Sequence, residues 1–111
     1  MRPESAALLW DARTACLRVI AFTEGLDAQV YADDDLRRSA VERQLEIIGE
    51  ALNTLRKSDG ETAALIPELA RIVGLRNVLA HGYAVVDDSV VWAAASNRVP
   101  VLLGLVDELL S

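Results

Sequence analysis

The sequence has one cysteine and one histidine among its 111 residues, and these two scarcities exclude several kinds of site. A lone Cys16 cannot form an internal disulfide, which agrees with a cytoplasmic location. Cys16 falls within an apolar helical pattern, so we expect a small core residue and not a nucleophile. One histidine and one cysteine are also too few for a His/Cys zinc site.

Long apolar runs are lacking as well. We expect no stretch to reach the roughly 18 to 20 residues needed to cross a bilayer, because Glu50, Arg71 and Arg76 interrupt the longest candidates. The first five residues carry an acid and lack the apolar segment of a signal peptide. We therefore expect a cytoplasmic protein with no membrane segment and no targeting segment.

Basic residues are outnumbered, with 11 Lys and Arg against 17 Asp and Glu and a net charge of −6. This balance argues against a general nucleic-acid coat protein, which would be basic. It leaves room for an enzyme that touches RNA through a small basic patch. It also suits a protein that pairs with a basic partner.

Apolar residues, by contrast, make up 52% of the chain. That fraction is ample for one packed domain, residues 1–111, and leaves a surplus that a second copy could cover. Apolar side chains recur at spacings of three and four, with no alternating runs that would predict strands. We therefore expect an all-α, up-and-down bundle of four to five helices that forms a homodimer.

Caps and turn residues give approximate helix bounds. The expected helices run from an N-cap at Ser5 to Gly25, from about Leu36 to Arg56, from Ile66-Pro67 to Gly82, and from Asp87 to about Leu110. Residues 27–35 read as a polar loop that could include one turn of helix, and Asp33 to Asp35 can cap the second helix. Pro100 should interrupt the last helix, and Gly74, inside the third, suggests close packing of a neighbouring helix.

An acidic row, Glu42, Glu46 and Glu50, lies along the second expected helix. Its simplest interpretation is a solvated face or a set of ion pairs with Arg38 and Arg43. A divalent-cation site is the alternative, but no Glu-x-x-His pairing accompanies the row.

Four polar or ring-polar residues gather at the end of the third expected helix: Arg76, Asn77, His81 and Tyr83. By position alone, His81 could simply cap the helix or fill the core. Asn77 and His81 are one turn apart and share a face, whereas Arg76 points about 140° away from His81. Either the long side chains converge on a common groove, or a second copy of the helix completes a site.

This set of side chains suits metal-independent RNA cleavage. RNA carries its own nucleophile, the 2′-hydroxyl, and a histidine can take its proton or protonate the leaving oxygen. An arginine can stabilise the additional negative charge on the phosphate. Asparagine can orient the phosphate or the imidazole.

The run Arg76-Asn77-Val78-Leu79-Ala80-His81-Gly82-Tyr83 resembles the Arg-x4-His-x-Tyr signature of HepT-like toxins in the HEPN superfamily. Residues 41–51 resemble the second-helix stretch of that family, and Val90-Val91-Trp92 with Asn97 and Pro100 resembles its last helix. The resemblance therefore extends from about residue 36 onward.

The resemblance implies a dimeric helical bundle whose site lies in a cleft where two copies of the motif helix meet. Arg76 and His81 would be the catalytic pair, with Asn77 in support and no cofactor or metal. The partner would be a nucleotidyltransferase antitoxin of the MntA type, which would transfer AMP to Tyr83. Two alternatives stay open: a non-catalytic HEPN module that binds a nucleotidyltransferase, and a purely structural helical dimer.

Overall fold

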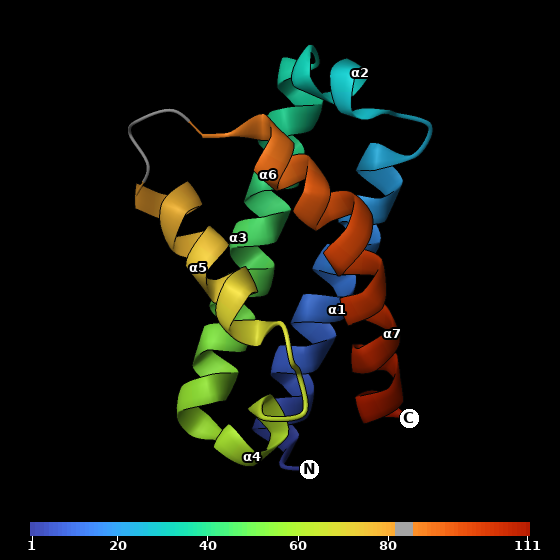
Figure 1. Cartoon of the computed structure of the whole chain (residues 1–111). Coiled ribbons are helices and arrows are strands. Elements are labelled where there is room, and N and C mark those ends of the chain that lie inside the picture. Colours follow the sequence, from blue (N-terminus) through green and yellow to red (C-terminus); the bar gives the residue numbers. More distant parts are fainter. Residues whose placement is uncertain (82–85) are drawn as a thin grey trace.

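The computed structural model describes residues 1–81 and 86–111, and every regular element within these ranges is helical (Figure 1). The elements are α1 (Pro3–Thr23), α2 (Ala28–Ala32), α3 (Asp35–Ser58), α4 (Gly60–Ala63), α5 (Leu69–His81), α6 (Asp88–Ala93) and α7 (Val99–Leu110). A π-helical turn, Ala94–Arg98, joins α6 to α7. The all-α expectation is confirmed, with the short α2 and α4 added to four long up-and-down segments. The two termini lie at the same end of the bundle (Figure 1).

The core lies where α1 and α3 pack together and where α7 covers α1. Its fully buried side chains include Leu9, Cys16, Ile48, Leu52 and Val106. Helix α5 packs chiefly against α3 and lies at the edge of the bundle (Figure 1). One side of α5 is therefore covered by the core, and the other faces outward.

Aspartates begin most of the helices. The carboxylates of Asp27, Asp34, Asp59 and Asp87 each accept a hydrogen bond from a backbone N–H in the first turn that follows. Such caps satisfy N–H groups that have no partner within the helix. The expected cap of the second long helix is thus confirmed at Asp34.

Two expected helix starts are wrong. Helix α1 begins at Pro3, whose fixed φ suits a first position, and Ser5 is buried within it. Helix α5 begins at Leu69, because the first hydrogen bond that spans four residues runs from the N–H of Ile72 to the carbonyl of Glu68, at 3.1 Å. Ile66 instead donates its N–H to Ala63 and closes the turn that ends α4.

Pro100 interrupts the last helix as expected, and the interruption takes the form of the π-helical turn just before it. There the N–H of Val99 donates to the carbonyl of Ala94, five residues back. Pro100 has no N–H to donate, so the helix cannot continue through it with an unbroken hydrogen-bond ladder. A wide turn of this kind is a recognised way to absorb such a break.

Residues 88–110 form one helical run that is long and apolar enough, by composition, to span a membrane. The expectation that no stretch reaches that length is therefore wrong for this segment, which carries few charges. Part of this run nevertheless packs inside the helical bundle. Val99, Leu102 and Val106 are buried in the core, and Asp107 pairs with Arg13 of α1 at 2.6 Å.

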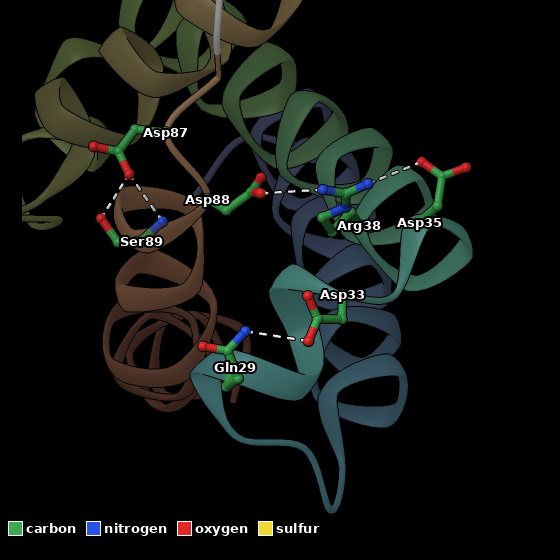
Figure 2. Close-up of polar contacts among 7 residues, drawn as sticks. All are labelled: Gln29, Asp33, Asp35, Arg38, Asp87, Asp88 and Ser89. Atoms are coloured by element: carbon green, nitrogen blue, oxygen red, sulfur yellow. Dashed lines mark hydrogen bonds and ion pairs between the residues drawn. The ribbon is translucent and has the colours of Figure 1, made fainter.

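Arg38 fixes the start of α6 against α3. Its guanidinium pairs with Asp35 at 3.1 Å and with Asp88 at 3.2 Å (Figure 2). Nearby, Asp87 accepts hydrogen bonds from the N–H and hydroxyl of Ser89 and so caps α6 (Figure 2). Arg38 was expected to pair with the acidic row, and it pairs with these two aspartates instead.

Asp59, which lies between α3 and α4, connects the first turn of α1 to α4. It accepts hydrogen bonds from the hydroxyls of Ser5 (2.6 Å) and Thr62 (2.7 Å) and from the N–H of Thr62 (3.2 Å). These hydrogen bonds, that of Ser5 first, hold the pKa of Asp59 well below its usual range. Because the folded pKa lies below the unfolded one, the stabilisation is present above about pH 4 and is lost as the pH falls below it.

We therefore expect Asp59→Asn to lower the Tm at pH 6, and the difference from wild type to shrink as the pH falls toward about 2. Thermal unfolding followed by circular dichroism at both pH values measures this. Glu61→Gln, which removes the same charge from an exposed position of α4, is the control and should show little change. An equal Tm difference at both pH values would contradict the role of the Asp59 charge.

Candidate functional site

Helix α5 carries three of the four motif residues within the described chain: Arg76, Asn77 and His81. Asn77 and His81 are exposed, whereas the side chain of Arg76 is only 24% exposed. Tyr83, the expected site of modification, lies outside the described residues. The motif side chains therefore have two environments, one against α3 and one facing outward.

Helix α5 comes close to α3 at Gly49. A Cβ atom at Gly49 would lie 2.2 Å from Cβ and 2.7 Å from Cγ of Arg76, and 3.3 Å from the carbonyl oxygen of Ile72. The absence of a side chain at Gly49 thus lets the stem of Arg76 rest directly on the α3 backbone. Gly74 was expected to mark a close approach, but a Cβ atom there would have nothing within 4 Å, so that expectation is wrong within the single chain.

The guanidinium of Arg76 is held from two sides. One terminal nitrogen forms an ion pair with the carboxylate of Glu50 on α3. The other donates to Oδ1 of Asn77 at 3.1 Å. A guanidinium has five N–H groups, so these contacts leave further donors for a phosphate oxygen.

A groove of about 530 Å³ is lined by residues of α1 and α3 and by Arg76 of α5. Its charged lining is mixed, with three arginines (Arg18, Arg43 and Arg76) and three acids (Asp11, Glu46 and Glu50). Arg43 and Glu46 pair with each other at 3.4 Å. The groove is therefore not a basic channel, and of its arginines only Arg76 belongs to the motif helix.

His81 is not part of this groove. Because α5 is helical from Leu69 to His81, His81 lies about 7.5 Å along the axis from Arg76 and about 140° around it. It shares the outward face of α5 with Gly74, Asn77 and Val78, all of them exposed. A single chain therefore does not bring Arg76 and His81 together into one compact site.

Sequence reasoning missed the roles of Gly49 and Glu50. A glycine inside a long amphipathic helix is a signal, because it lowers helix stability unless a neighbour needs the space. In the sequence, Glu50 is apparent only as a break in an apolar run and as the end of the acidic row. Two of the three glutamates in that row do form ion pairs, Glu46 with Arg43 and Glu50 with Arg76.

Cys16 is a core residue, as expected. It is fully buried, and this burial, with a smaller effect of Asp107, raises the pKa of its thiol to about 12. A thiol so far from ionisation is a poor nucleophile at neutral pH. Over residues 1–81 and 86–111, no group of three or more His, Cys, Asp or Glu side chains is arranged to hold a metal ion.

Comparison with known proteins identifies the family. The model of the family described as "Ribonuclease HepT-like" matches residues 12–109, which extends the resemblance well before residue 36. The chain is 35% identical over 94 residues to "Putative RNase MJ1380" of Methanocaldococcus jannaschii, covering 85% of each chain. It is 32% identical over 95 residues to "Putative RNase TTE0752" of Caldanaerobacter subterraneus, covering 86% of this chain and 84% of the relative. No solved structure matches the chain significantly. With a family model that covers nearly its whole length and relatives above 30% identity, this chain belongs to the HepT-like ribonuclease family.

Proposed function

We propose that this protein is a metal-independent endoribonuclease that acts in the cytoplasm as the toxin of a toxin–antitoxin pair. The observation that carries the proposal is the state of Arg76. Its guanidinium is held by Glu50 of α3 and by Asn77 of α5, and α5 also presents the exposed His81. Its membership of a family described as ribonucleases supports RNA as the substrate.

In the proposed reaction, the ribose 2′-oxygen attacks the adjacent phosphorus and the bond from phosphorus to the 5′-oxygen breaks. His81 would accept the proton from the 2′-hydroxyl, or donate one to the departing 5′-oxygen. Arg76 would stabilise the negative charge that builds on the phosphate oxygens. The products are a 2′,3′-cyclic phosphate and a 5′-hydroxyl, and no step calls for a metal ion.

We propose that a second copy of the chain completes the site. The outward face of α5 carries Asn77 and His81 together with the exposed Val78, which is 54% exposed, and the small Gly74. An absent side chain at Gly74 permits another helix to approach closely. A symmetric dimer built on this face could place His81 of one copy near Arg76 of the other.

Inducing the chain alone in a bacterial host tests the proposed function. We expect wild type to arrest growth and fragment total RNA on a denaturing gel. An Arg76→Ala/His81→Ala double variant, produced at the same soluble level, should do neither. If wild type is harmless at that level, the catalytic proposal fails.

The same strains test the proposed antitoxin. We propose that a nucleotidyltransferase of the MntA type neutralises the toxin by transferring AMP to Tyr83, two residues after His81. Each AMP adds bulk and about one negative charge, which would repel RNA. The nucleotidyltransferase should therefore rescue wild type but not a Tyr83→Phe variant. Equal rescue of both would favour neutralisation by complex formation.

A non-catalytic module that binds a nucleotidyltransferase is the second candidate. The net charge of −6 favours it, because an acidic surface does not attract RNA at long range. It predicts that wild type is harmless and RNA stays intact, while the chain still forms a stable complex with the nucleotidyltransferase.

A further inference from the structure

We infer that Glu50 is a positioning residue for Arg76, and that it acts together with the backbone at Gly49; this inference rests on the proposed RNA cleavage. Glu50 and Gly49 are neighbours on α3, 26 to 27 residues away in sequence from Arg76 on α5. Together they contact both ends of the Arg76 side chain. Cβ and Cγ of Arg76 pack against Gly49, and its guanidinium forms an ion pair with Glu50.

The contact at Gly49 fixes where the arginine side chain begins. With Cβ and Cγ of Arg76 resting on the α3 backbone, the first bonds of the side chain have little freedom to rotate. The long remainder of an arginine would still sample many rotamers, and fixing those rotamers carries an entropic cost. An arginine that must contact a phosphate in one geometry therefore acts more efficiently if its rotamer is already fixed before RNA binds.

The ion pair with Glu50 supplies this restraint at the other end. Glu50 is 59% exposed and Arg76 is 24% exposed, so an isolated surface pair of this kind contributes little to folding stability. Its geometric effect is larger, because carboxylate and guanidinium groups match in shape and in their hydrogen-bonding groups. Asn77 meets the other terminal nitrogen at 3.1 Å, which leaves the guanidinium held between two acceptors.

Glu50 also places a negative charge beside the arginine, and this gives a discriminating expectation. If Glu50 served only to neutralise Arg76, removing its charge would strengthen RNA binding and raise activity. If Glu50 positions Arg76, removing its charge should lower kcat by about 10- to 100-fold, the size expected for a misplacement of about 1 Å. In that case KM should stay the same or fall.

The test compares Glu50→Gln with Glu46→Gln, its matched control. Glu46 lies one turn earlier on α3 and pairs with Arg43, which is not a motif residue. We expect Glu50→Gln to lower kcat with no rise in KM and little change in Tm, and Glu50→Asp to recover part of the loss. Glu46→Gln should retain the wild-type kcat. A wild-type kcat in Glu50→Gln, or a loss confined to KM, would overturn the inference.

A second measurement does not depend on cleavage. Nitrogen-15 NMR of the arginine side chains should show restricted rotation of the Arg76 guanidinium in wild type and faster rotation in Glu50→Gln. Arg18, which is exposed and forms no ion pair with any described residue, is the internal reference for free rotation. Free rotation of Arg76 in wild type would overturn the inference. If wild type cleaves no RNA, the proposed function fails, and this comparison still decides whether Glu50 holds Arg76.

Discussion

A heterodimer of one Arg76→Ala chain and one His81→Ala chain should cleave RNA, although neither variant does so alone. Each single variant should lose about 10²- to 10⁴-fold in kcat, the usual size for a missing acid–base group or charge stabiliser. If each site takes its arginine from one copy and its histidine from the other, the heterodimer has one intact site and one that lacks both groups. It should then show about half of the wild-type activity per dimer.

The physical reason is the direction of the two side chains on α5. Arg76 turns inward to Gly49 and Glu50, and His81 is exposed on another side of the same helix. A straight helix cannot bring the two groups together within one chain, because residues five apart differ by about 140° in direction.

Two affinity tags, one on each variant, allow the heterodimer to be purified after co-expression, and steady-state cleavage of a labelled RNA then measures kcat per dimer. Arg71→Ala is the matched control for Arg76→Ala, since it removes an exposed arginine of the same helix. Activity no greater than that of the single variants would show that both groups act from one chain. Failure to recover any heterodimer would contradict the proposed dimer.

Gly49→Ala should destabilise the protein by about 1 to 3 kcal/mol, the usual range for overpacking a tight contact. The new methyl group would lie 2.2 Å from Cβ of Arg76, and a Cβ atom cannot move unless its backbone moves. Helix α5 would therefore have to shift by roughly 1 Å or more before ordinary van der Waals contact is restored. Because that shift also displaces Arg76, we expect kcat to fall by about 100-fold in the protein that still folds.

Gly104→Ala is the matched control, because it makes the same chemical change inside a helix. Gly104 lies in α7, and a Cβ atom added there would have nothing within 4 Å. Alanine there should stabilise the protein by about 0.5 to 1 kcal/mol and leave cleavage unchanged. Urea unfolding curves for the two variants should thus move in opposite directions. A Gly49→Ala protein as stable and active as wild type would show that α5 does not need the close approach.

Local sequence pattern predicts the long helices of this protein better than it predicts where each helix begins. Periodic apolar residues, aspartate caps and Pro100 are enough to predict four long helices and the interruption of the last one. These features act within a few residues of the chain, where each helix makes its own backbone hydrogen bonds. The starts of α1 and α5 are predicted less well, because Ser5 and Ile66 have partners that the local pattern does not reveal.

The sequence by itself determined the helical class, the aspartate caps at Asp34 and Asp87, and the placement of Arg76, Asn77 and His81 on one helix. Only the tertiary structure decided which glycine lies under a neighbouring helix and which glutamate meets Arg76. Gly49 and Gly74 look alike in sequence, since each interrupts an apolar helical pattern, and only Gly49 is covered. Glu46 and Glu50 are likewise one turn apart on the same helix, and only Glu50 reaches α5. The reason is that periodicity fixes which face of a helix is buried, while the rotation and height at which two helices meet depend on how all their side chains interlock.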